Sequence, residues 1–211
     1  WKCVESLSIW KFGEVVMKTL FIVFPKAGGH MICAFREIKT RVGLYAENGE
    51  KGDLKPESYY LNIIKNSDCD ISGNFYYTDK IYKALKDNGF RIVFIYRDLW
   101  DVSVSWWKNL TEQFDNFVQF PTPDGRLLKD QDDPLMVVIH EVARIWDKFE
   151  PWMTKADAVY NYAELRGAAL LLGKEEKSGK YFRTGNVGDW HKYFEPRHIE
   201  EALRILPEIE K

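Results

Sequence analysis

Residues 19–30 read Thr-Leu-Phe-Ile-Val-Phe-Pro-Lys-Ala-Gly-Gly-His, and this stretch decides the fold. The run from Thr19 to Phe24 is mostly apolar, rich in β-branched and aromatic residues, and followed by a proline, which predicts a buried strand. Two glycines come next. Apolar residues then recur at helical spacing, at Met31, Ile32, Ala34, Phe35 and Ile38. We therefore predict a strand, a glycine turn and a helix.

The rest of the chain alternates between the same two kinds of element. Residues 91–96, Arg-Ile-Val-Phe-Ile-Tyr, form the clearest buried strand. The pattern predicts further strands at 69–72 and 158–162, and helices at 79–88, around 102–106, at 134–152 and at 196–205. Polar stretches rich in Gly, Pro or Asp predict loops at 46–58 and 120–134.

Strands that alternate with helices predict an α/β fold, with a central parallel β-sheet flanked by helices. We expect one domain over residues 1–211, a length that supports a substantial core. Met17 is a candidate native start, which would make residues 1–16 an extension. Ligands of parallel sheets bind at the carboxyl ends of the strands, so we expect the site after Phe24, after Tyr96 and around Tyr162.

Composition narrows the partners and the compartment. The formal net charge of -2 does not favour nucleic acid as a partner. The longest apolar run is too short to cross a bilayer, so no membrane is expected. Three cysteines, Cys3, Cys33 and Cys69, argue against a disulfide framework and for the cytoplasm. The 8 Trp, 11 Tyr and 13 Phe indicate a ring-rich core, a pocket for planar groups, or both.

The glycine turn is the first of three candidate anion-binding stretches. Backbone N–H groups of Ala27, Gly28, Gly29 and His30, together with a helix N-terminus, can cradle an anion, and Lys26 adds a positive charge. The turn lacks Gly-Lys-Ser/Thr, so it is not a Walker A loop, and no hydroxyl is placed to hold Mg²⁺. The alternative is a tight connection without a ligand.

The other two stretches contain arginines. Arg97 directly follows the strand at 91–96, where its planar fork can hold a phosphate, and Ser105 lies two helical turns further on. Alternatively, Arg97 pairs with Asp98 or Asp101. The third stretch, 183–190, is a loop in which Arg183 and the backbone of Thr184 and Gly185 can wrap over a phosphate. Its alternative is a surface loop anchored by Trp190.

The three stretches together resemble the sulfotransferases that use 3′-phosphoadenosine-5′-phosphosulfate (PAPS). Residues 25–28 are similar to the family's Pro-Lys-Ser-Gly-Thr-Thr-Trp loop for the 5′-phosphosulfate. Residues 97–105 resemble its 3′-phosphate motif, Arg-Asn/Asp-Pro-x-Asp-x-x-Val-Ser. Residues 183–190 resemble Arg-Lys-Gly-x-x-Gly-Asp-Trp. The blocks occur in the family's order, and the resemblance spans residues 19–194.

The resemblance implies a P-loop-like fold, a nucleotide co-substrate and a role for each matched residue. Lys26 would contact the bridging oxygen and the sulfuryl group, and the backbone of Ala27 to His30 would hold the 5′-phosphate. The 3′-phosphate would be held by Arg97, Ser105 and Arg183. Tyr162 would lie near adenine. Met31 replaces the family's adenine-stacking Trp and can still pack against a ring.

The match departs from the family at the general base. Many members carry a histidine where this chain has Asn74, and an amide cannot act as a base. Three explanations stay open: a histidine was changed to asparagine, another residue serves, with His140 as the candidate, or the acceptor is a nitrogen that needs less help. His140 is alternatively a structural residue. We expect His191 on a surface loop and His198 facing solvent.

The reaction implied is transfer of a sulfuryl group from PAPS, without a metal, to a hydroxyl or amine of a small molecule. We expect rings to line the acceptor pocket, at Phe75, Tyr76, Tyr77, Trp106 and Trp107, although several of these rings could be core. Two other functions remain: a P-loop kinase-like phosphotransferase, and a catalytically inactive nucleotide-binding protein, which Asn74 would suit.

Overall fold

Five strands form the centre of the molecule. The computed structural model describes residues 17–36, 38, 40–44, 54–112, 126, 128–171 and 186–208. The strands lie side by side in the order β2-β3-β1-β4-β5, and each pairs with its neighbours in parallel. Their bounds are β1 Thr19–Val23, β2 Thr40–Val42, β3 Ile71–Gly73, β4 Arg91–Tyr96 and β5 Ala158–Asn161.

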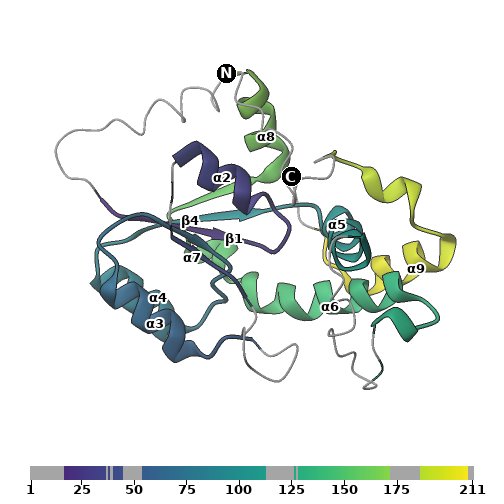
Figure 1. Ribbon diagram of the computed structural model, residues 1–211, viewed down its shortest axis with the longest axis horizontal. Coiled ribbons are helices and arrows are strands. Elements are labelled where there is room, and N and C mark those ends of the chain that lie inside the picture. The colour runs from purple at the N-terminus through teal and green to yellow at the C-terminus, as the bar shows by residue number, and fades with distance from the viewer. Residues whose placement is uncertain are drawn as a thin grey trace.

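Helices cover both faces of this sheet. Figure 1 shows α2 and α8 on one side of the strands and α3 and α4 on the other. The α-helices are α2 Gly29–Arg36, α3 Glu57–Asn66, α4 Asp79–Asp87, α5 Leu99–Glu112, α6 Pro134–Phe149, α7 Trp152–Lys155, α8 Tyr162–Leu171 and α9 Pro196–Ile205, and the short 3₁₀ helices are η2 Leu128–Asp130 and η3 Asp189–Lys192. The prediction of an α/β domain with a parallel sheet and flanking helices is confirmed.

The central strand β1 is buried along its whole length. Phe21 lies opposite Ser72 of β3 on one side and Val93 of β4 on the other. A parallel strand covered by helices on both faces has no solvent-facing side, which explains why its sequence is apolar without alternation. The same reasoning holds for β4, where five of six residues are buried.

The register brings the strand ends together. Ile22 lies opposite Gly73, Val23 opposite Ile95, and Tyr96 opposite Asn161. Strands β3, β1, β4 and β5 therefore end at one edge of the sheet. We call it the carboxyl edge. Residues that follow these four strands are brought close together although they are far apart in sequence.

Helix α6 begins where the sequence favours a helix start. Asp133 is its N-cap and accepts a hydrogen bond from the Met136 N–H, and Pro134 occupies the first turn, where its missing N–H costs nothing. The apolar face of α6 packs beneath the end of β1: Phe24 meets the rings of Trp146 and Phe149, both at 5.3 Å. Burial of these rings fixes the start of the glycine turn.

Several predicted boundaries differ from the structure. The sequence analysis did not predict β2 or α3, and α3 begins inside the stretch that we assigned to a loop. β2 has only three residues, and α3 follows Pro56, which supplies no side-chain cap. The predicted helix at 134–152 ends at Phe149, before Pro151. Tyr162 begins α8 rather than ending β5.

Among the helices of the described ranges, none combines the length and the apolar character needed to cross a membrane.

Candidate nucleotide and acceptor site

The turn after β1 holds two residues in unusual backbone conformations. Lys26 has φ of 64° and Gly28 has φ of 89°. The Phe24 N–H donates to Ile95 O, and the Ala27 N–H donates to Phe24 O, both at 2.9 Å. A non-glycine residue in the left-handed region is uncommon and costs about 1 kcal/mol or more. Such strain at Lys26 is typical of a functional turn.

Gly28 is required for a second reason. A Cβ atom at this position would lie 2.7 Å from the ring carbons Cδ2 and Cε2 of Tyr162. Tyr162 follows β5 and is 5% exposed. The structure thus brings together two residues predicted for the nucleotide, one from each side of the carboxyl edge.

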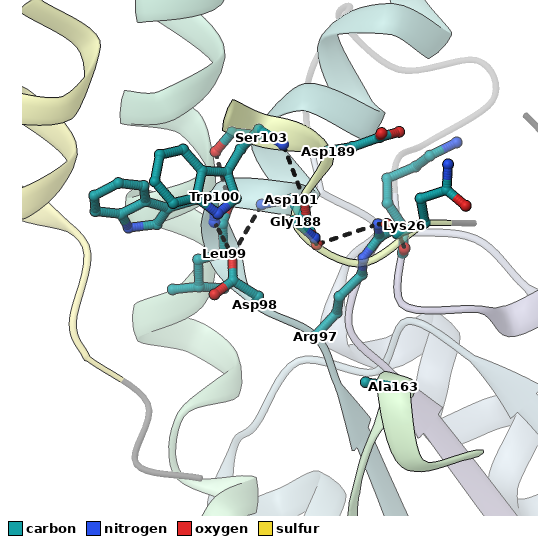
Figure 2. Close-up of polar contacts among 12 residues, drawn as sticks. Lys26, Arg97, Asp98, Leu99, Trp100, Asp101, Ser103, Ala163, Gly188 and Asp189 are labelled. Atoms are coloured by element: carbon teal, nitrogen blue, oxygen red, sulfur yellow. Dashed lines mark hydrogen bonds and ion pairs between the residues drawn. The ribbon is translucent and has the colours of Figure 1, made fainter. Parts of the chain in front are cut away.

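Arg97 lies between them at the end of β4. Its side chain is 5% exposed, and its guanidinium carbon lies 4.9 Å from the centre of the Tyr162 ring. Nη2 donates to Asn186 O at 2.7 Å, and Nη1 donates to Lys26 O at 3.5 Å. Nε is buried and has no hydrogen-bond partner in the described part of the chain. Figure 2 shows the Arg97 side chain directed toward Lys26 and Gly188.

Asp101 fixes the segment that covers this arginine. The carboxylate is 1% exposed and accepts hydrogen bonds from the N–H groups of Gly188 at 2.8 Å and Trp190 at 3.2 Å (Figure 2). It also lies 3.6 Å from Arg97 Nη2. Of the two aspartates considered as partners of Arg97, Asp101 is the one in contact. The sequence analysis missed its role in anchoring the loop.

Asp98 caps the start of helix α5. Its Oδ1 accepts from the N–H groups of Trp100 and Asp101, both at 3.0 Å. Ser105 lies further along α5 and is half-buried. Its predicted contact with a 3′-phosphate stays a prediction.

The remaining residues predicted for the nucleotide fall into two groups. Ala27 is fully buried, and Met31 is 6% exposed on α2. Gly29 begins α2, and the His30 side chain lies outside the described part of the chain. Residues Arg183, Thr184 and Gly185 also lie outside it. The covering loop is described only from Asn186 onward.

Asn74 follows β3 at the same carboxyl edge. Its side-chain Nδ2 donates to Val23 O of β1 at 2.5 Å, and its backbone N–H donates to Val42 O at 3.0 Å. Val23 is three residues before Lys26. The predicted base position therefore lies beside the glycine turn, and its amide group is bonded to the end of β1.

The histidines are placed elsewhere. His140 is half-exposed on α6, with Nε2 2.9 Å from Glu201 of α9, and its role as a base stays a prediction. His191 is exposed, as expected, and stacks on Trp190, but it lies in the short 3₁₀ helix η3 rather than in a loop. The expectation that His198 faces solvent is wrong: it is 3% exposed, its Nε2 bonds to Asp133, and its Nδ1 accepts from the Glu195 N–H. The imidazole can be buried because both of its ring nitrogens are hydrogen-bonded.

The predicted acceptor rings are largely buried. Phe75 is fully buried, and Trp106 is 5% exposed. Phe75 O accepts from Trp152 Nε1 at 2.9 Å, and the Tyr77 N–H donates to Lys148 O at 2.7 Å. Phe75 and Trp106 therefore contribute to the core. Tyr76, Tyr77 and Trp107 are half-buried, and the structure does not test whether they line an acceptor pocket.

Burial and hydrogen bonding raise the pKa values of the phenols on this side. Burial raises the pKa of Tyr60, and burial together with the Glu57 charge raises that of Tyr76. A hydrogen bond to Asp79, with some burial, raises the pKa of Tyr77 to about 12. All three phenols therefore stay protonated at neutral pH.

The described residues contain no group of three or more His, Cys, Asp or Glu side chains that could hold a metal ion.

Comparisons with known proteins agree with the fold. No protein-family model matches the chain, and no curated protein matches it by sequence. Among solved structures, the mouse sulfotransferase SULT7A1 complexed with PAP matches with a TM-score of 0.52 and 13% identity, over 96% of this chain and 86% of that one. A retinol dehydratase in complex with androsterone and inactive cofactor PAP matches with a TM-score of 0.41 and 12% identity, over 97% and 85%. The first of these matches shows that the chain has a sulfotransferase-like fold.

Proposed function

We propose that this protein is a sulfotransferase that moves the sulfuryl group of PAPS to a hydroxyl or amine of a small acceptor. The observation that carries the proposal is Arg97. Its Nε is buried and has no hydrogen-bond partner among the described residues, and its guanidinium lies beside the glycine turn and the Tyr162 ring. An unpaired buried donor is costly, whereas a phosphate oxygen would accept from it and neutralise the charge. The fold shared with a PAP-bound sulfotransferase supports the same assignment.

The nucleotide would span the carboxyl edge from β1 to β5. Its 5′ end would lie on the backbone of Ala27 to His30, beside Lys26. Its 3′-phosphate would meet Arg97, and the adenine would lie near Met31 and Tyr162. Ser105 and the stretch 183–185 would complete the 3′-phosphate site. Asn186 O now accepts from Arg97 Nη2, so a phosphate there would either use Nε or displace that carbonyl.

The proposed reaction is an in-line displacement at sulfur. The acceptor forms a new bond to sulfur as the bond from sulfur to the bridging oxygen of PAPS breaks. Negative charge then builds on that oxygen, and the Lys26 ammonium would stabilise it. Much of the rate would come from holding donor and acceptor in line. No metal takes part in this scheme.

The free thiols Cys33 and Cys69 suit our further proposal that the protein works in the cytoplasm.

A ligand comparison tests the proposal against phosphotransfer. PAP is adenosine 3′,5′-bisphosphate, the nucleotide that remains when PAPS has given up its sulfuryl group. It should raise the melting temperature of the protein more than Mg-ATP does, because only PAP carries a 3′-phosphate for Arg97. Turnover of PAPS with any acceptor would exclude an inactive binding protein. A larger shift with Mg-ATP would favour a kinase-like enzyme instead.

A further inference from the structure

The carboxyl edge contains few groups that could take a proton from an acceptor. Among the side chains that the structure describes, those just beyond its four strand ends include two kinds of possible base: carboxylates and phenols. They also include Asn74, which faces the glycine turn. The imidazole of His30, in the glycine turn, lies outside these described side chains. The carboxylates and the phenols make hydrogen bonds that limit their ability to take up a proton.

The carboxylates hold backbone groups. Asp98 accepts two N–H bonds at the start of α5, and Asp101 accepts two from the loop over Arg97. Proton transfer to either carboxylate would disturb these bonds. Glu164, on α8, is exposed and accepts from the Asn161 N–H at 3.4 Å. All three carboxylates lie on the β4 and β5 side, away from β3.

Tyr162, beyond β5, packs its ring against Gly28 and the Arg97 guanidinium. The three phenols on the β3 side, Tyr60, Tyr76 and Tyr77, keep their protons. Tyr76 donates its hydroxyl proton to Lys55 O at 3.1 Å, and Tyr77 donates its own to Asp79 Oδ1 at 2.7 Å. The hydroxyl of buried Tyr60 lies 3.3 Å from Leu44 O and donates to it. A phenol that stays protonated at neutral pH cannot act as a general base.

Asn74 can orient an acceptor but cannot deprotonate it. The carbonyl of Val23 can only accept, so the amide NH₂ group must face it, and Oδ1 lies on the opposite side of the amide. Oδ1 is a neutral hydrogen-bond acceptor. It can receive an N–H or O–H bond from a small molecule without taking the proton.

We infer, resting on the proposed function, that the acceptor is an amine with a free lone pair at neutral pH, such as an aromatic amine, which donates an N–H bond to Asn74 Oδ1. The nitrogen lone pair forms the S–N bond as the bond from sulfur to the bridging oxygen breaks, and PAP leaves with that electron pair. The nitrogen loses its proton to water after the bond has formed. An alcohol or phenol would need a base during the attack, and the described side chains on the β3 side of this edge supply none.

A matched pair of acceptors tests the inference. 2-Naphthylamine and 2-naphthol differ only in the reacting group, and kcat/KM for each is measured with PAPS at pH 7. We expect wild type to favour the amine by about tenfold or more. Asn74→His adds a base, so its kcat/KM for 2-naphthol should rise by about 10²-fold or more, and by far more than that for the amine. Asn62→His, on the exposed face of α3, is the control and should leave the ratio unchanged.

The outcomes separate the inference from the proposed function when PAP binding is measured on the same samples. If wild type binds PAP and sulfates 2-naphthol as well as the amine, the inference is wrong and the proposed function stands. The inference also fails if Asn74→His raises both rates equally, or if PAP binds and neither acceptor reacts. If wild type does not bind PAP at all, the proposed function itself fails.

Discussion

The two halves of the carboxyl edge differ in how they hold their polar groups. On the β4 and β5 side, which we call the nucleotide side, Arg97 and Asp101 are buried charges bonded to the backbone of two segments, the glycine turn and the covering loop. On the β3 side, which we call the acceptor side, a neutral amide and protonated phenols stand among buried rings. Under the proposed function, the nucleotide side would bind the anionic donor and the acceptor side would bind an apolar, neutral molecule. The charged groups of the reaction would then belong to the donor rather than to the acceptor.

The largest effect is expected from the ring core beneath the acceptor side. Trp152 is fully buried, its Nε1 donates to Phe75 O, and its ring lies 5.0 Å from that of Tyr77. Trp152→Ala should lower the free energy of unfolding by about 3–5 kcal/mol in urea denaturation. Trp152→Phe keeps most of the ring and loses the hydrogen bond, so its cost should be smaller. A loss below about 1 kcal/mol for the alanine variant would contradict this packing.

The next prediction concerns the close approach at the nucleotide side. Gly28 and Gly89 both have positive φ, 89° and 71°, but only Gly28 has a ring within 3 Å of a Cβ position. Gly89→Ala should cost about 1–2 kcal/mol of stability through its backbone alone. Gly28→Ala should cost about 1–3 kcal/mol more, because Tyr162 must shift, and should also weaken PAP binding. Equal losses for the two variants would mean that Tyr162 does not restrict Gly28.

A smaller effect is expected from the anchor of the covering loop. Asp101→Asn keeps the size of the side chain but places an NH₂ group against one of two N–H donors. The variant should lose about 1–3 kcal/mol of stability and bind PAP more weakly, since the loop over Arg97 loosens. Asp147→Asn, at an exposed position on α6, is the control and should change neither. Unchanged PAP binding in Asp101→Asn would separate this loop from the nucleotide site.

The smallest effect is expected at the amino ends of the strands, opposite the site. Asp157 precedes β5. Burial raises the pKa of its carboxyl, but hydrogen bonds from Lys86 Nζ and the Ile92 N–H outweigh burial and hold this pKa below its usual range. Because the folded pKa is the lower one, the stabilisation is present above the ordinary pKa of an aspartate. It is lost as pH falls through the folded value. Asp157→Asn should therefore lower the free energy of unfolding by less than about 1 kcal/mol at pH 7 and leave it unchanged at low pH. The affinity for PAP should not change.

Local patterns in the sequence predicted the elements that lie at the centre of the fold. Continuous apolar runs predicted β1 and β4 because both faces of these strands are covered. The same rule failed for β2, where only Val42 of three residues is buried. For α3, the absence of a capping side chain left no signal for its start.

For the site, short motifs predicted Lys26, Gly28, Arg97 and Tyr162, and the structure brings them to one edge. It also shows what spacing could not predict. The bonds of Asp101 join residues 87 and 89 apart. The burial of His198 depends on Asp133, which is 65 residues earlier. Such contacts depend on the tertiary arrangement, and no local pattern marks them.

The most direct measurement is the dissociation constant for PAP of wild type and of Arg97→Gln, by isothermal titration calorimetry. Arg204→Gln, on the exposed face of α9, is the control, and melting temperatures verify that each variant is folded. We expect wild type and Arg204→Gln to bind PAP equally and Arg97→Gln to lose about 10²-fold in affinity, because the fork that would hold the 3′-phosphate is gone. If wild type does not bind PAP, or if the folded Arg97→Gln variant binds it as tightly, the nucleotide side is not a site for this ligand.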